Sequence, residues 1–233
     1  MTQNPAPKDL SHITDWVFDL DNTLYPRRCN LFAQIDIRIT HYMMEVTRLD
    51  FEAARALQKV YYRDYGTTLN GLMQVHGIDP DHFLHTVHAI DYSPVDPHPA
   101  LVETIRALPG RKFILTNGDT DHARAVLGRL GGGDLFEHVH DIRAMTYVPK
   151  PHRQAYDGFL AQYGIAPDRA VMFDDLEKNL VVPHEMGMAT VQVRAEDDYE
   201  NDQVESWELE RSAGPHVHHV TQDLAGFLRT LLG

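Results

Sequence analysis

The sequence predicts an α/β fold, in which a parallel sheet carries helices on both faces and is interrupted after its first strand by a small helical insert. Two observations predict this arrangement. Short runs of apolar and β-prone residues alternate with helical patterns along most of the 233 residues, which is typical of a parallel sheet covered on both faces. A block with helical spacing alone follows the first of these runs, and a chain of this length can form a core domain with a smaller inserted one.

The first predicted strand covers residues 13–20. The segment ITDWVFDL ends in apolar and β-prone residues and then breaks into the turn-forming DNT, as expected for a buried strand that leads into a loop. Asp19 and Asp21 therefore lie at the carboxyl end of a strand, where open α/β sheets bind their ligands.

The block from about residue 31 to residue 88 is predicted to be helical. Apolar residues recur at helical spacing in LFAQIDIRITHYMMEV and in FEAARALQKVYYRDY. Three prolines between Asp91 and Pro99 prevent a helix there, so this segment is expected to return the chain to the core. The predicted domains are a core of residues 1–24 and 96–233 and an inserted cap of residues 25–95, with hinges expected near residues 25–28 and 93–97.

Alternation of strands and helices resumes after the insert. The further predicted strands are 111–119, 137–144, 170–175 and 188–193, and helices are expected at 101–108 and 122–130. Thr116 and Asn117 lie near the end of one of these strands, where it runs into a turn, and Asp174 and Asp175 lie at the end of another. Lys150 lies near a strand end or in the following helix. Because the carboxyl ends of parallel strands share one edge, these side chains are expected to converge.

The net charge of the chain limits the classes of partner that it can bind. A formal net charge of −13 disfavours binding to nucleic-acid polymers or anionic membranes, and no local basic patch is apparent in the sequence. An anionic ligand would have to be attracted by local groups such as a cation or aligned backbone amides. The acidic stretch at residues 196–210 is predicted to be a solvated loop or helix face without a chemical role.

Cysteine content and hydropathy favour a cytoplasmic location. The single cysteine, Cys29, excludes an internal disulfide and is expected to be buried. The start MTQNPAPKDL lacks the basic and apolar regions of a secretory signal. No window approaches the roughly 18 consecutive apolar residues of a membrane-spanning helix.

Four short motifs carry a resemblance to a known family. The segments FDLDNTL, ILTNGD, KP and FDD, in this order, resemble the four motifs of the haloacid dehalogenase-type (HAD) phosphatase superfamily, over nearly the whole chain. Each motif alone is weak because such strings are common and could form turns or helix caps. Together, at strand ends and with an insert after the first, they are specific. The resemblance implies a Rossmann-like core with a cap.

The resemblance also implies the chemistry. Asp19 would bind magnesium and attack phosphorus to form an aspartyl-phosphate, and Asp21 would be the general acid and base, with its backbone carbonyl on the metal. Asp174 would be the remaining metal ligand. Asp175 would act through a coordinated water or orient Lys150.

The phosphate of the substrate is expected to bind to a group of hydrogen-bond donors. Thr116 offers a hydroxyl, and Asn117 with Gly118 can present donors from a turn. Lys150 supplies a compact positive charge for the phosphoryl group and for the carboxylate of the nucleophile. Magnesium would neutralise the charge of a phosphomonoester before an anionic nucleophile approaches.

The substrate is expected to be a small phosphorylated metabolite. Asn22 in DNTLYP and the segment YRDYGTTLNGLMQVHG at residues 62–77 resemble the pyrimidine 5′-nucleotidase branch of the superfamily, which acts on nucleoside monophosphates such as UMP and CMP. Aromatic rings could stack on a base, and hydroxyl and amide groups could bind ribose, although packing explains the tyrosines equally well. The candidate substrate contacts are Tyr25, Tyr65, Thr67, Thr68 and Asn70.

Other interpretations remain open from the sequence. Phosphoglycolate or a sugar phosphate could be the substrate. A dehalogenase of the same superfamily would share the nucleophile and cap but would not need Asp21, and a phosphoacceptor module would lack both the cap and a positioned base. The fifteen histidines are expected to be surface or core residues rather than metal ligands. The sequence does not indicate an oligomeric state.

Overall fold

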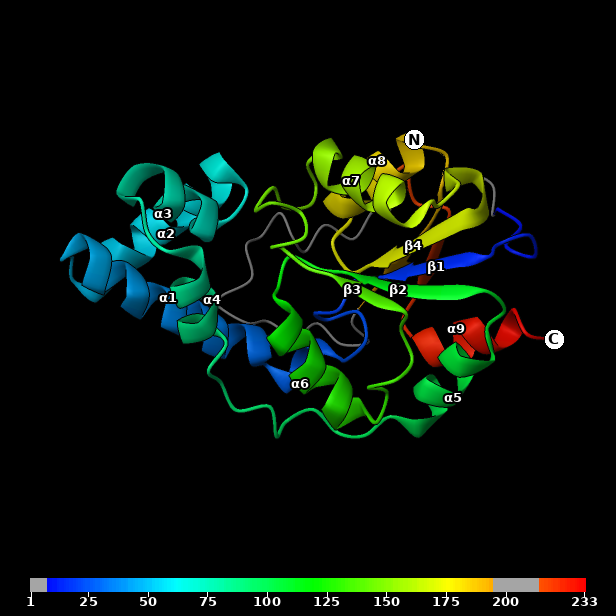
Figure 1. Cartoon of the computed structure of the whole chain (residues 1–233). Coiled ribbons are helices and arrows are strands. Elements are labelled where there is room, and N and C mark those ends of the chain that lie inside the picture. Colours follow the sequence, from blue (N-terminus) through cyan, green and yellow to red (C-terminus); the bar gives the residue numbers. More distant parts are fainter. Residues whose placement is uncertain (1–7, 195–213) are drawn as a thin grey trace.

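One parallel sheet of six strands organises the part of the chain that the structure, a computed structural model, describes, which is residues 8–194 and 214–233. The strand order is β3-β2-β1-β4-β5-β6 (Figure 1). The strands are β1 (Asp15–Phe18), β2 (Arg111–Leu115), β3 (His138–His140), β4 (Ala170–Asp174), β5 (Ala189–Val193) and β6 (His219–Thr221). This arrangement confirms the predicted α/β, Rossmann-like fold.

The first strand of the chain lies in the interior of the sheet. β1 pairs in parallel with β2 on one side and with β4 on the other, so that Phe18 is opposite both Ile114 and Phe173. The residues that follow these three strands therefore leave the sheet at the same edge. This register brings distant segments of the sequence together above the carboxyl end of β1.

Helices cover both faces of the sheet. In Figure 1, α7 (Arg153–Tyr163) and α8 (Lys178–Glu185) lie over one face, while α5 (Pro99–Ala107), α6 (Thr120–Leu130) and α9 (Leu224–Thr230) lie over the other. Side chains of β1 alternate between the two cores: Trp16 and Phe18 pack on the side of α5, α6 and α9, and Val17 packs on the opposite side. This alternation follows from the two-residue period of a strand.

Four helices between β1 and α5 form the cap. They are α1 (Leu31–Thr47), α2 (Phe51–Tyr65), α3 (Thr68–His76) and α4 (Pro80–Val87), and all lie within residues 25–95. Side chains cap three of them: Asp50 accepts from the backbone of Ala53 at 2.9 Å, and Thr67 and Asp79 do the same for α3 and α4. A short 3₁₀ turn at Arg27–Cys29 precedes α1. Cys29 is buried, as predicted.

The segment that returns from the cap lies along α6. Arg129 donates from Nε to the carbonyl of Val95 at 3.1 Å and from Nη2 to the carbonyl of Ser93 at 2.9 Å. The backbone N–H of His98 donates to the carbonyl of Leu130 at 3.1 Å. Residues 93–98 are therefore held against the core helix.

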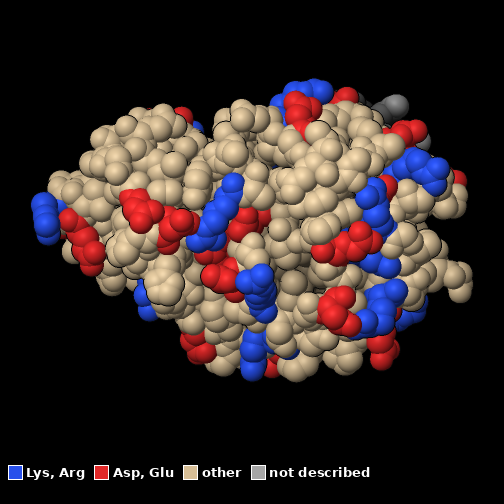
Figure 2. Space-filling view, in the orientation of Figure 1, with Lys and Arg blue, Asp and Glu red and all other residues tan. Residues whose placement is uncertain are grey.

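The structure also shows where the sequence patterns were incomplete. β3 is much shorter than the predicted strand 137–144, and β6 had not been predicted. The acidic stretch 196–210 lies outside the described residues. No helix in the described ranges is long and apolar enough to cross a membrane. On the face shown in Figure 2, basic and acidic side chains are intermixed.

Candidate active site

Lys150 joins the ends of β1 and β4. Its Nζ donates to Oδ1 of Asp19 at 2.8 Å and to Oδ2 of Asp174 at 2.7 Å. Only 2% of Lys150 is exposed. Burial alone would lower the pKa of Lys150, but the carboxylates of Asp174 and Asp19 outweigh this effect and raise it above its usual value. The lysine therefore remains charged between the two aspartates.

The end of β2 holds Lys150 in place. Nδ2 of Asn117 donates to the carbonyl of Lys150 at 3.1 Å, and the N–H of Lys150 donates to Oδ1 of Asn117 at 2.8 Å. Lys150 lies in the loop between β3 and α7, and its peptide bond to Pro151 is cis. The side chain of Asn117 thus positions the lysine, and the predicted contact of this turn with phosphate stays a prediction.

Three carboxylates gather beside this ion pair. Among the described residues, Asp19, Asp174 and Asp175 each offer an oxygen, and these oxygens lie within 4.8 Å of one another. Asp174 is fully buried, and its Oδ1 accepts from the N–H of Leu176 at 2.9 Å. Asp175 pairs with Nη2 of Arg27 at 2.9 Å. Asp175 thus belongs to the same cluster as the predicted ligands and contacts the start of the cap.

The donor set of this cluster suits magnesium. Its ligand atoms are carboxylate oxygens, which hard divalent cations prefer. Burial raises the pKa of Asp19 well above its usual value; Asp174, Asp175 and Asp21 raise it further, and Lys150 opposes the rise. Lys150 therefore leaves part of the negative charge uncompensated. Magnesium held by Asp19, Asp174 and Asp175 would offset this charge and favour the ionised form of Asp19.

Asp21 has a different environment. Strand β1 ends at Phe18, and the following turn includes Asn22 at φ 58°, so Asp19 and Asp21 do not follow the side-chain pattern of one strand. Oδ1 of Asp21 accepts from the hydroxyl of Tyr25 and lies 2.7 Å from Nε2 of His122. Burial would raise the pKa of Asp21, but His122 and Tyr25 outweigh it and lower the pKa to about 2.

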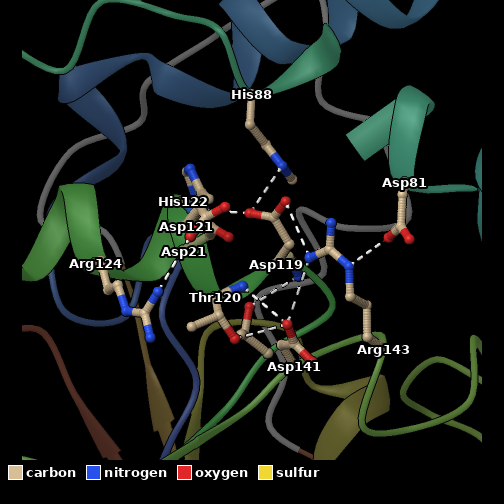
Figure 3. A network of polar contacts seen from close by, with 12 residues as sticks. Asp21, Asp81, His88, Asp119, Thr120, Asp121, His122, Arg124, Asp141 and Arg143 are labelled. Atoms are coloured by element: carbon tan, nitrogen blue, oxygen red, sulfur yellow. Dashed lines mark hydrogen bonds and ion pairs between the residues drawn. The ribbon is translucent and has the colours of Figure 1, made fainter. Parts of the chain in front are cut away.

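A network of polar contacts joins Asp21 to the cap (Figure 3). Nδ1 of His122 lies 3.0 Å from the hydroxyl of Tyr92, and its ring stacks on His88 with centroids 4.6 Å apart. Asp119 caps α6 by accepting from the N–H of His122 at 2.8 Å and pairs with His88 at 3.3 Å. Nη1 of Arg143 lies 3.3 Å from Oδ2 of Asp119.

The same network crosses between the two domains. Arg143 of the core also donates from Nε to Oδ1 of Asp81, in the first turn of α4, at 2.6 Å. Burial would raise the pKa of Asp119, but His88, the N–H of His122 and Arg143 outweigh this effect and lower it. No role was predicted for these histidines from the sequence, although His122 stands in the first turn of α6, which begins directly after the predicted ligand-binding turn.

Thr116 and Gly118 complete the floor of the site. Thr116 is 1% exposed, and its Oγ1 accepts from the N–H of Gly118 at 3.0 Å. A Cβ atom on Gly118 would lie 3.2 Å from the ring of His122 and 3.4 Å from Oγ1 of Thr116. The absence of a side chain at this position thus keeps the turn close to Asp21 and its histidine partner.

A cavity of about 390 Å³ lies between the core site and the cap. Core residues that line it include Asp19, Asp21, Thr116, Gly118 and Lys150, and all four cap helices contribute to the remaining wall. Within the cap wall, Asp36 pairs with Arg55 at 2.9 Å and accepts from Nε2 of Gln58. The cavity therefore connects the acidic cluster with a polar group in the cap.

The predicted substrate contacts are placed differently from one another. Thr67 and Thr68 line the cavity, whereas Tyr25, Tyr65 and Asn70 are not among its lining residues in the described ranges. Tyr25 is 2% exposed and serves Asp21. Asn70 donates to the carbonyl of Tyr65 at 3.1 Å. The substrate contacts of these five residues stay predictions.

Comparison with known proteins identifies the family. A sequence profile described as haloacid dehalogenase-like hydrolase matches residues 17–180. The chain belongs to the haloacid dehalogenase-like hydrolases. The match begins within β1 and extends past the end of β4, and so includes Asp19, Lys150, Asp174 and Asp175.

Two curated proteins are similar to much of this chain. The chain is 26% identical over 205 residues to phosphate metabolism protein 8 of Saccharomyces cerevisiae, covering 80% of this chain and 64% of that protein. It is 26% identical over 155 residues to the (S)-2-haloacid dehalogenase of Xanthobacter autotrophicus, covering 65% and 58%. The chain thus spans less than two thirds of the length of these curated relatives.

The fold is also that of solved HAD structures. The HAD phosphatase of Thermococcus onnurineus superposes with a TM-score of 0.60 over 95% of this chain and 98% of that chain, at 16% identity. At this identity, the likeness establishes the shared fold alone.

Proposed function

We propose that this HAD hydrolase is a magnesium-dependent phosphomonoesterase that works through a phosphorylated Asp19, with pyrimidine nucleoside 5′-monophosphates such as UMP and CMP as substrates. The observation that carries the proposal is the pairing of Lys150 with Asp19 and Asp174 beside the carboxylate of Asp175. This arrangement supplies a nucleophile, a positive charge and a set of oxygen ligands at one point.

The first half of the reaction transfers the phosphoryl group to the protein. An Asp19 oxygen forms a bond to phosphorus while the bond from phosphorus to the leaving oxygen breaks, and a proton passes from Asp21 to that oxygen. Magnesium bound by Asp19, Asp174 and Asp175 would neutralise phosphate charge. Lys150 and the hydroxyl of Thr116 stabilise the transferred group.

The second half regenerates the nucleophile. A water molecule gives a proton to the Asp21 carboxylate while the water oxygen bonds to phosphorus. The bond between phosphorus and Asp19 breaks at the same time. Inorganic phosphate leaves. The lowered pKa leaves Asp21 ionised in the free protein, so the proton that it gives to the leaving group arrives with the bound phosphomonoester, and the proton that it takes from water leaves with inorganic phosphate. One residue thus serves as acid and then as base.

The surroundings of Asp21 favour a phosphatase over a dehalogenase. A halide leaves a carbon centre without needing a proton, whereas a leaving alkoxide requires one. Asp21 is partly exposed at the cavity wall and has two hydrogen-bonding partners, Tyr25 and His122. Such a placement is suited to proton transfer and has no function in halide release.

The cavity supports a substrate of nucleotide size. A volume of about 390 Å³ falls within the range of small-molecule sites, roughly 300–1,000 Å³. The polar cap group of Asp36, Arg55 and Gln58 could meet hydroxyls or a base edge. Phosphoglycolate and sugar phosphates are smaller alternatives that the same chemistry would accept.

Phosphate release from p-nitrophenyl phosphate tests the reaction class. We expect activity with magnesium, and we expect a chelator or Asp19→Asn to abolish it. Release of chloride from 2-chloropropionate without phosphate release would instead establish a dehalogenase.

A panel of UMP, CMP, AMP, phosphoglycolate and sugar phosphates then tests the substrate. We expect the highest kcat/KM for UMP and CMP. A preference for phosphoglycolate or a sugar phosphate would refute the nucleotide assignment while leaving the phosphatase intact.

A further inference from the structure

His122 is held at both ends of its ring. Its side chain is 0% exposed and projects from the first turn of α6. Nε2 lies 2.7 Å from Oδ1 of Asp21, and Nδ1 lies 3.0 Å from the hydroxyl of Tyr92. Stacking on His88 fixes the plane of the ring from a third direction. The imidazole therefore has a single orientation.

The direction of these hydrogen bonds follows from proton counting. Tyr92 has one hydroxyl proton and donates it to the carbonyl of His88 at 3.0 Å. Its oxygen must then accept from Nδ1 of His122. Oδ1 of Asp21 already accepts from Tyr25. A second hydrogen bond on that oxygen must come from Nε2–H of His122, and an imidazole that donates from both nitrogens carries a positive charge.

Both contacts leave the other oxygen of Asp21 available. Oδ2 has no hydrogen bond from the residues that the structure describes, and it lies beside Gly118, 3.7 Å from where a Cβ atom would stand. Gly118 and Asp21 both line the cavity. Oδ2 is thus the oxygen of Asp21 that a leaving group in the cavity can reach.

We propose that His122, supported by Tyr92, is a positioning residue that clamps Oδ1 of Asp21 so that Oδ2 exchanges the proton with the leaving group. This inference rests on the proposed phosphatase function and extends it to a residue with no contact to the phosphate. Tyr92 belongs to the segment returning from the cap, so the alignment of the acid is set partly from outside the core.

Two aryl phosphates of nearly equal shape provide the test. Phenol is a more basic leaving group than p-nitrophenol and depends more strongly on a proton donor. With phenyl phosphate, His122→Phe should lower kcat/KM by about 100-fold, whereas p-nitrophenyl phosphate should lose less than about 10-fold. His122→Gln, which can still donate to Asp21, should recover part of the loss.

Further variants separate positioning from folding. Tyr92→Phe removes the acceptor of Nδ1 and should produce the same dependence on leaving group, with a smaller loss. His85→Phe, at an exposed position of α4, is the matched control and should leave both rates unchanged. If His122→Phe does not fold, as judged by circular dichroism, Tyr92→Phe and His122→Gln decide the question.

The outcomes distinguish the two claims. An equal loss with both aryl phosphates, or no loss with either, overturns the role of His122 while leaving the phosphatase in place. Wild-type protein that releases phosphate from neither compound refutes the proposed function and, with it, this inference.

Discussion

Asp19 and Asp21 are two residues apart, yet their surroundings act on them in opposite directions. Around Asp19, burial and the neighbouring carboxylates raise the pKa, and Lys150 opposes the rise only in part. Around Asp21, His122 and Tyr25 overcome burial and lower the pKa to about 2. Crowded carboxylates create a place for a cation, whereas a carboxylate held by a histidine and a tyrosine is suited to proton exchange. Identical side chains thus acquire two functions from their partners.

The largest expected effect is on turnover. Asp19→Asn should lower kcat/KM by at least about 10⁴-fold because it removes the nucleophile. Asp21→Asn should lower it by about 10²- to 10⁴-fold because it removes proton transfer alone. Phosphate release from phenyl phosphate measures both. Equal activity of the Asp19→Asn and wild-type proteins would show that Asp19 is not the nucleophile.

Loss of Lys150 beside Asp19 and loss of His122 beside Asp21 should lower the free energy of unfolding by different amounts. Lys150→Met leaves Asp19 and Asp174 buried without their cation and should cost about 3–5 kcal/mol. His122→Phe should cost about 1–3 kcal/mol, because Asp21 keeps its bond from Tyr25. Urea denaturation without magnesium gives both free energies of unfolding. A larger loss for His122→Phe would reverse the comparison.

Magnesium should stabilise the protein through the carboxylates around Asp19 and not through the side chain of Asp21. At a concentration 100 times its Kd, bound magnesium should add about 2.7 kcal/mol of stability, visible as an increase in Tm that a chelator removes. Asp174→Asn should weaken this response. Asp21→Asn should retain it, because the Asp21 side chain faces His122. Loss of the magnesium response in Asp21→Asn would contradict this division.

The smallest expected effect is on the free energy of unfolding at acid pH. The folded pKa of Asp21 is lowered from 3.8 to about 2, so the folded chain binds this proton less readily than the unfolded chain does. The stability that Asp21 contributes is therefore present above pH 3.8 and is lost as the pH falls towards 2. Urea denaturation at pH 5, 4 and 3 should show a steeper loss for wild type than for Asp21→Asn. Parallel curves would refute the lowered pKa.

The Asp19 region was largely accessible from the sequence. Asp19, Thr116 and Asp174 follow apolar strands, and parallel strands end at one edge of the sheet, so the pattern alone brings these residues together. Lys150 could be placed only by resemblance, because it lies in a loop whose position depends on Asn117. Asp175 was expected beside the metal, acting through a water or on Lys150, and its carboxylate lies in the cluster with Asp19 and Asp174; a strand pattern does not show whether a residue after the strand end can reach the ion directly.

The Asp21 region was mostly beyond prediction. His122 meets Asp21 because β1 and β2 are neighbours and α6 starts above them, which requires knowledge of the strand order. Tyr25, one of the candidate substrate contacts, donates its hydroxyl to Asp21, and no sequence pattern indicated this partner. The histidines carried no pattern that distinguishes a ring clamped between Tyr92 and Asp21 from one on the surface. Contacts between side chains of distant segments do not produce a repeating pattern in the sequence, so they cannot be predicted from periodicity.

Because Arg129 and Leu130 fasten residues 93–98 to α6, a tilting cap has its pivot on the cap side of Ser93. Tyr92 stands next to that pivot, and Asp81 stands at the far end of α4. Rigid rotation displaces a point in proportion to its distance from the axis, so Tyr92 would shift little while the Asp81 contact with Arg143 would separate first. A rotation about this point would therefore open the contact between Asp81 and Arg143 while it left Tyr92 beside His122.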